Sequence, residues 1–408
     1  MKNDSSFTKN RAGKRRVAVS LLTILVAVGV GLLLAEVSLR IIGFRYLNLY
    51  QADQHVGYAL RPGAAGWWTK EGETYVEINN DGLRDREHSK VKPADTLRIA
   101  VLGDSFAEAL QVPVAMAFWA VAEQRLPGCK EFAGQKVEII NFGVSGFSTA
   151  RELITLRQRV WQYSPDIIVL VVTTSNDIRD NSLLLDQEYA GLPLPYFVYK
   201  NGVLVLDDSL LKARDESLKS RLMKSFLGKS LNWLRDHLRL IGLIDKSRVA
   251  LQNYTDRQDK GLRSFGDEPG ITATVYVEPT DPVWDEAWRI TEGLVLLMRD
   301  EVKAHGARFL IVTGSSSIQV YPDPAIRLNF MRSSGIKDLF YPDRRIRALG
   351  EREGIEVLNL APALQEYADH NRTFLHGTNG FGHWNTLGHR LVGDRVAEKL
   401  CQIGSTNR

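Results

Sequence analysis

The sequence has 408 residues, which is enough for one large domain or two domains of ordinary size. Hydrophobic residues make up 44% and charged residues 25%, as expected of a globular protein with a real core. The formal net charge is +4, and much of the positive excess lies among the first 16 residues, so charge gives no basis for a nucleic-acid partner.

The first predicted element is an uncharged stretch of 19 residues, VAVSLLTILVAVGVGLLLA, at residues 17–35. Its length suits a helix that spans a bilayer. Basic residues precede it, so the positive-inside rule makes residues 1–16 a cytoplasmic basic tail and puts the chain after about residue 44 on the periplasmic or extracellular side. The alternative is a cleaved signal peptide, whose apolar core usually has about 7–15 residues before a small-residue cleavage site. The longer stretch, with no clear site in LLLAEVSL, favours a single-pass anchor in the inner (cytoplasmic) membrane.

Residues 45–96 are predicted to form a lead-in segment. The stretches RPGAAGWWTK and NNDGLRDRE are clusters of turn-forming residues, with little regular pattern between them. We expect a few strands here, packed on the main domain that follows.

From Arg98 onward, apolar runs alternate with helical patterns. The runs are continuous, which is typical of strands buried on both faces. The predicted strands are Ile99–Leu102, Val137–Ile140, Ile167–Thr173, Phe309–Thr313 and Ile355–Leu360. The predicted helices cover about residues 114–126, 150–162, 286–304, 344–353 and 386–401. Residues 97–404 are therefore predicted to be an α/β domain with a mostly parallel sheet, and a functional site is expected at the carboxyl ends of its strands.

An insertion at about residues 181–280 interrupts this alternation. It begins with a predicted hairpin that turns at Asn201-Gly202. A long amphipathic helix is predicted at about residues 215–243, with an apolar stripe and several basic residues. The stripe either packs on the main domain or belongs to a basic helix that lies on the membrane surface or covers the site.

Four residues at strand ends or in loops have the chemistry that acyl transfer requires. Ser105, in GDS, follows the first strand and is either a nucleophile or the N-cap of the next helix. After the second strand, Gly146 offers a backbone N–H, and after the third, Asn176 offers a side-chain amide. His383 lies just before the last predicted helix, where it can serve as a base.

With these four blocks in this order, the chain resembles the SGNH hydrolases, also called GDSL-type esterases. The matching residues are Gly103-Asp104-Ser105, Gly146, Asn176-Asp177 and His383, and INNDGLRD and GHWNTLGHR resemble the membrane-anchored bacterial branch. The resemblance implies a flavodoxin-like three-layer α/β/α sandwich following the N-terminal transmembrane helix. It also implies Ser105 as nucleophile, His383 as general base, and an oxyanion hole made by the N–H groups of Ser105 and Gly146 and the Asn176 amide.

Two positions depart from the family pattern. Gly380 stands where the family often has an Asp three residues before the histidine, and Thr174 replaces a glycine of the third block. Asp369 is a weak candidate for the missing acid, so we predict a Ser–His dyad in which a backbone carbonyl orients the imidazole. His389 is expected to pack or cap, and His376 receives no role.

These features predict a membrane-anchored serine esterase that works through an acyl-Ser105 intermediate on an acylated small molecule or polysaccharide. The first alternative is an O-acetyltransferase that passes the acyl group to a cell-surface polysaccharide. The second is a non-catalytic binding protein on an esterase fold. No cofactor or metal motif is present, the oligomeric state is not indicated, and Cys129 and Cys401 are compatible with one disulfide without implying it.

Overall fold

A computed structural model of the chain describes residues 5–44, 47–186, 192–217, 220–222, 225–244, 247 and 272–405. The chain divides into two compact units. The anchor unit combines Met1–Tyr46 with Arg221–Gly261, and the main unit combines Leu47–Ser220 with Leu262–Arg408. Each is described by itself below.

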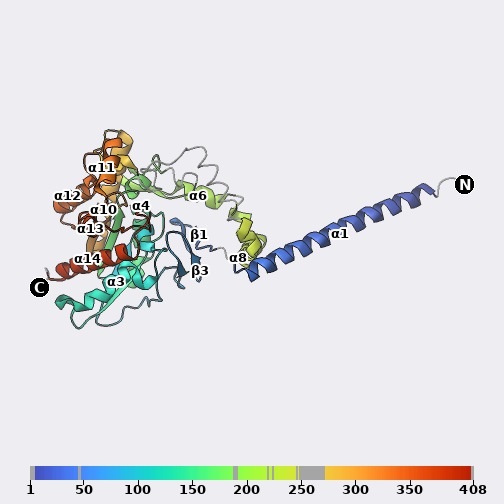
Figure 1. The fold of residues 1–408 in the computed structure, drawn as a ribbon, viewed down its shortest axis with the longest axis horizontal. Helices are drawn as coiled ribbons and strands as arrows, with labels where there is room; N and C mark the ends of the chain where they lie inside the picture. The colour runs from blue at the N-terminus through green and yellow to red at the C-terminus, as the bar shows by residue number, and fades with distance from the viewer. Residues whose placement is uncertain are drawn as a thin grey trace. The chain divides into compact units, whose positions relative to one another are not determined.

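The main unit is built on a five-stranded parallel sheet (Figure 1). Its strands are β5 (Thr96–Leu102), β6 (Lys136–Asn141), β7 (Ile167–Thr173), β10 (Arg308–Gly314) and β11 (Glu356–Asn359). The spatial order is β11-β10-β7-β5-β6, and every neighbouring pair is parallel. Counted along the chain, this is the order 2-1-3-4-5 of the flavodoxin-like fold. The predicted parallel sheet is confirmed, and all seven residues of both β5 and β7 are buried, which explains their continuous apolar runs.

Helices cover both faces of this sheet, because successive strand side chains point to opposite sides. In β5, Ala100 and Leu102 join one core, whereas Ile99 and Val101 join the other. The first core contains side chains of α4 (Thr149–Gln158), α10 (Pro282–Ala304), α11 (Pro324–Ser333) and α12 (Tyr341–Glu353). The second contains side chains of α3 (Phe118–Arg125), α13 (Ala361–Asn371) and α14 (Thr386–Ser405). The result is the predicted three-layer α/β/α sandwich.

Capping residues at the starts of two helices explain differences between the predicted and the observed helices. Helix α10 begins four residues earlier than predicted, because Asp281 caps it by accepting a hydrogen bond from the Val283 N–H and Pro282 occupies its first turn. The same Asp-Pro arrangement at Asp323 starts α11, which sequence analysis did not predict. Helix α13 was also missed.

The lead-in segment forms two small antiparallel hairpins outside the main sheet. They consist of β1 (Tyr50–Asp53) paired with β2 (Gly57–Leu60), and β3 (Ala65–Trp68) paired with β4 (Thr74–Glu77). Leu60 and Val76 are buried in the first core of the main unit. The hairpins are therefore part of the same packed body as the sheet.

The insertion contains the predicted hairpin but not the predicted long helix. Strands β8 (Tyr196–Lys200) and β9 (Val203–Asp207) turn at Asn201-Gly202, and both turn residues have positive φ. The single helix over residues 215–243 is wrong. Helix α6 (Ser209–Glu216) ends at Ser217, which is extended, and α8 (Phe226–His237) begins after Ser225, whose hydroxyl accepts from the Gly228 N–H. Residues 248–271 of the predicted insertion lie outside the described residues.

The anchor unit contains the longest helix of the described chain, α1 (Ser5–Ile41). Its segment Val19–Ile41 has 23 residues and a mean hydropathy of 2.3, and it is long and apolar enough to cross a membrane. Such a helix serves either as a membrane anchor or as a signal sequence.

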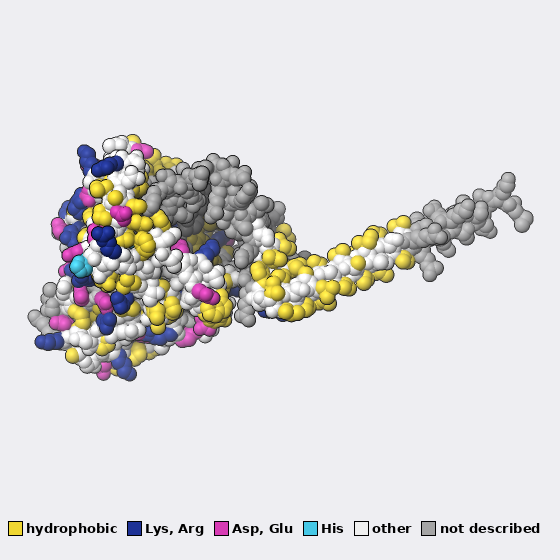
Figure 2. All heavy atoms as spheres, viewed as in Figure 1, with side chains coloured by type: hydrophobic (Ala, Val, Ile, Leu, Met, Phe, Trp, Pro, Cys, Tyr) yellow, Lys and Arg dark blue, Asp and Glu magenta, His cyan; other side chains and the backbone are white. Residues whose placement is uncertain are grey.

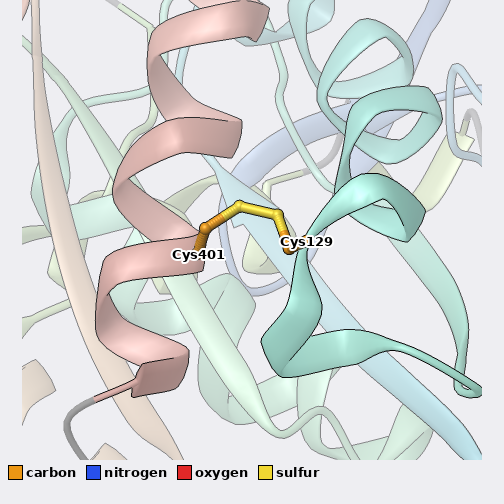
Figure 3. The surroundings of a disulfide bond; sticks show 2 residues. All are labelled: Cys129 and Cys401. Carbon is orange, nitrogen blue, oxygen red and sulfur yellow. A yellow bond between two sulfur atoms is a disulfide. The ribbon is translucent and has the colours of Figure 1, made fainter.

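The two cysteines form a disulfide between Cys129 and Cys401 (Figure 3). Their Cα atoms are 5.9 Å apart, and the bond joins the turn after α3 to the last helix, α14. The pairing that the sequence left open is therefore made within the main unit, across 272 residues of chain.

We predict that replacing both cysteines by alanine lowers the free energy of unfolding by about 2–4 kcal/mol, because the unfolded chain regains the freedom that the cross-link removes. Thermal unfolding of the full-length protein in detergent, with and without reductant, measures the change. The midpoint should fall on reduction of the native protein and should not respond to reductant in the double variant. An unchanged midpoint on full reduction of the native protein would contradict this.

Candidate active site

Ser105 lies at the carboxyl end of β5, where the sheet places a functional site. It is the first residue of α2 (Ser105–Glu108), and the residue that caps this helix is Asp104, whose carboxylate accepts the Phe106 N–H at 3.0 Å. The alternative in which Ser105 is the N-cap is therefore wrong. Its hydroxyl is left for a different partner.

That partner is His383, in the loop between α13 and α14. The His383 Nε2 atom lies 2.8 Å from Ser105 Oγ, which is the distance expected between a serine nucleophile and its general base. The His383 side chain is 31% exposed, so the pair is accessible from solvent. The structure thus brings together the first and the last of the four blocks.

The third member of the arrangement is Glu71, which sequence analysis did not identify. Glu71 lies in the turn between β3 and β4, and its Oε2 atom is 2.8 Å from His383 Nδ1. The same oxygen accepts the backbone N–H of His383 at 2.7 Å. The predicted dyad with a backbone carbonyl behind the imidazole is wrong, because a carboxylate occupies that place.

Backbone geometry around His383 explains why the acid comes from elsewhere. Gly380, at the position of the family's Asp, has φ +89°, and a Cβ there would lie 2.6 Å from the Tyr321 ring and 2.8 Å from that of Phe374. Gly382 lets Glu71 approach, since a Cβ at 382 would lie 2.4 Å from Glu71 Oε2. The weak candidate Asp369 is instead paired with Arg327 through two hydrogen bonds of 2.6 and 2.8 Å.

Electrostatics keep Glu71 ionised. Partial burial alone would raise the pKa of its carboxyl, but the hydrogen bonds and charge of His383 outweigh burial and hold the pKa below its usual range. An ionised carboxylate at Nδ1 fixes the imidazole tautomer in which Nε2 carries no proton and can accept one, and such a carboxylate stabilises an imidazolium.

The candidate oxyanion donors belong to loops that contact the Ser105 loop and its helix. In the described part of the chain, no hydrogen-bond partner is found for the N–H of Ser105 or of Gly146. The Asn176 amide donates to Asp104 Oδ2 at 3.1 Å, and Asp104 Oδ1 also accepts from the Thr173 hydroxyl at 3.0 Å. Burial raises the pKa of Asp104, although these hydrogen bonds oppose the shift. Asp104 thus ties the third block to the nucleophile loop.

The loop that carries Gly146 is fixed to the nucleophile helix. Gly143 passes so close to α2 that a Cβ there would lie 2.5 Å from that of Ala107. The N–H of Ser145 donates to the Glu108 carboxylate at 2.8 Å, and the Ser145 hydroxyl bonds the same oxygen. Gly146 itself has φ +73°, a conformation that favours glycine.

Two further histidines support the site from inside the protein. His376 Nδ1 donates to the Gly382 carbonyl at 2.6 Å, and His389 Nδ1 accepts the Phe118 N–H at 3.2 Å. Burial lowers the pKa of His376 to about 4 and that of His389 to about 3, so both rings are neutral at pH 7. Their contacts are structural: His376 holds the turn before His383, and His389 holds the start of α3. Thr174, which replaces the family's glycine, is buried beside Asn176.

Among the described residues, no group of three or more His, Cys, Asp or Glu side chains is placed to hold a metal ion.

No family model matches the chain, and no curated protein sequence matches it. Solved structures that it resembles include an acetyl xylan esterase (13% identity, 74% of this chain, 98% of that chain, TM-score 0.36). Another is an acetylxylan esterase from Geobacillus stearothermophilus (12% identity, 76% of this chain, 96% of that chain, TM-score 0.36). A third is a lipase/acylhydrolase from Enterococcus faecalis (12% identity, 75% of this chain, 96% of that chain, TM-score 0.35). At TM-scores below 0.5, such a likeness establishes neither activity nor substrate.

We predict that Glu71→Gln lowers kcat for ester hydrolysis by about 10³–10⁴-fold with little change in KM, because the amide neither fixes the imidazole tautomer nor stabilises the imidazolium. Steady-state kinetics on a soluble ester measure the effect.

The matched control is Glu73→Gln, which changes an exposed carboxylate two residues away in the same turn and should leave kcat unchanged. Equal rates for Glu71→Gln and the native protein would remove Glu71 from the site.

Proposed function

We propose that this protein is a membrane-anchored serine esterase of the SGNH type. The observation that carries the proposal is the hydrogen-bond chain from Glu71 through His383 to Ser105. Gly146 and Asn176, in loops tied to the Ser105 loop and helix, support the family assignment. A non-catalytic binding protein has no physical need for this arrangement.

The positions of these groups support the following reaction. Ser105 Oγ attacks the ester carbonyl carbon while its proton passes to His383 Nε2, and the carbonyl oxygen becomes an oxyanion. The unpaired N–H groups of Ser105 and Gly146, with the Asn176 amide, donate hydrogen bonds to that oxygen. As the carbon–oxygen bond to the alcohol breaks, the imidazolium returns its proton to the leaving alkoxide, and acyl-Ser105 remains. Water then repeats the sequence and releases the acid.

Two features support a location outside the cytoplasm. The apolar helix Val19–Ile41 follows a basic tail, which favours an anchor with the rest of the chain on the far side of the inner membrane. The Cys129–Cys401 disulfide is characteristic of an oxidising compartment such as the periplasm or cell exterior.

Transfer to a sugar hydroxyl is the second candidate function. The observation that favours it is the exposure of the site: the Glu71 and His383 side chains are each about one-third exposed. An open site admits either a polysaccharide hydroxyl or water to the acyl-serine, and His383 can activate both. The substrate is then an acylated small molecule or polysaccharide.

We predict that the full-length protein in detergent hydrolyses p-nitrophenyl acetate, and that Ser105→Ala and His383→Ala each reduce kcat by at least about 10³-fold. A fluorophosphonate probe should label the native protein and not the Ser105→Ala variant. Ser334→Ala and His370→Ala change exposed residues away from the site and should retain full activity.

A folded native protein with neither turnover nor labelling would reject the esterase and leave the binding-protein alternative. Adding a polysaccharide acceptor separates the two enzymatic candidates. Acetylation of the polysaccharide at the expense of free acetate indicates a transferase, whereas an unchanged acetate yield indicates an esterase.

A further inference from the structure

Helix α8 (Phe226–His237) belongs to the anchor unit, although it lies almost 200 residues after α1 in the sequence. We propose that α8 and the residues flanking it lie in the headgroup region of the outer leaflet and bind anionic lipid there. This inference rests on the proposed membrane anchor and goes beyond it.

The first argument is the set of hydrogen bonds that joins the end of α8 to the end of α1. Arg40 donates to the His237 carbonyl at 2.9 Å. Arg239 donates to the carbonyls of Leu39 and Arg40, each at 3.2 Å. The Leu240 N–H donates to the Glu36 carboxylate at 3.0 Å. These contacts lie within the last turns of the apolar span.

The chemistry of these contacts suits the end of a membrane helix. The last carbonyls of a helix have no partner within the helix, and they carry its partial negative charge. Arg239 supplies hydrogen bonds and positive charge to two of them, while Glu36 is held between Arg40 and the Leu240 N–H. The chain that follows α8 is thereby fixed at the depth where the span Val19–Ile41 ends.

The second argument is the exposure of large apolar side chains on and around α8. Phe226 is 84% exposed and Trp233 is 59% exposed, and Leu222 and Ile244, which flank the helix, are 64% and 59% exposed. Figure 2 shows hydrophobic side chains along α1 as far as its C-terminal end, where the hydrogen bonds to the end of α8 are made. Aromatic side chains of this kind concentrate at membrane interfaces, and because α8 is held at the end of the span, lipid is the partner that covers them.

The third argument is charge. Within the anchor unit, the sequence of residues 221–239 contains a single acidic residue, Asp236, among five basic ones: Arg221, Lys224, Lys229, Arg235 and Arg239. A basic segment next to a membrane surface attracts anionic headgroups. The segment therefore has both components of an interfacial helix, apolar anchors and positive charge.

The experiment uses the full-length protein in lipid nanodiscs, with an environment-sensitive fluorophore on a single introduced thiol. The chain has two cysteines, which form the disulfide, so an introduced cysteine is labelled selectively. The test variant is Phe226→Cys. Val30→Cys, within the span, is the positive control, and Leu328→Cys, an exposed residue of α11 in the main unit, is the negative control.

Lipids with a spin label near the headgroup should quench the fluorophore at 226, and lipids labelled deep in the acyl chain should quench that at 30. The fluorophore at 328 should be quenched by neither. Replacing part of the phosphatidylcholine by phosphatidylglycerol should increase quenching at 226, and high salt should abolish the increase.

The outcomes separate the two proposals. If the fluorophore at 30 escapes quenching, the membrane anchor itself is wrong. If the fluorophore at residue 30 is quenched but the fluorophore at residue 226 is quenched no more than the one at residue 328, the membrane anchor stands. The proposal of an interfacial helix is then overturned. Quenching at 226 that does not respond to phosphatidylglycerol would overturn the preference for anionic lipid.

Discussion

The structure of the site depends on one carboxylate oxygen. Glu71 Oε2 accepts both the backbone N–H and the ring Nδ1–H of His383, so the hairpin β3–β4 fixes the position of the loop and the orientation of the imidazole together. With the ring held from behind, its other nitrogen meets Ser105. Because the loop alone contains no acid that can do this, the active geometry exists only when the hairpin is docked.

The lead-in segment is held in place by buried polar contacts with the nucleophile helix. Tyr50 donates to the Glu108 carboxylate at 3.0 Å, and Arg84 donates to the carbonyls of Glu108 and Val112. Tyr58 donates to the Ser145 carbonyl at 2.8 Å, next to Gly146. Burial raises the pKa of Glu108, whereas its hydrogen bonds and the charge of Arg84 oppose the shift. The lead-in segment therefore supports both the Ser105 helix and the loop of Gly146, and it contributes the carboxylate that contacts His383.

Sequence analysis predicted the sheet and the Ser105–His383 pair, because both leave a local signal. Strands buried on both faces produce continuous apolar runs, and GDS and GHW mark strand and helix ends. Glu71 leaves no such signal: it is one of three acidic residues in the eight-residue stretch 70–77, and only tertiary contact distinguishes it from Glu73. The prediction of a single helix at about residues 215–243 was wrong for a related reason. Ser217 and Ser225 interrupt an otherwise regular apolar spacing.

The separation of Glu71 from His383, 312 residues, has a consequence for biosynthesis. A chain is synthesised from its N-terminus, so Glu71 and Ser105 leave the ribosome long before His383. His383 can join them only when synthesis has passed residue 383 and the last helix can pack on the body of the domain. The hydrogen-bond chain from Glu71 through His383 to Ser105 therefore forms late in synthesis, and an incompletely synthesised chain has Ser105 without its imidazole partner.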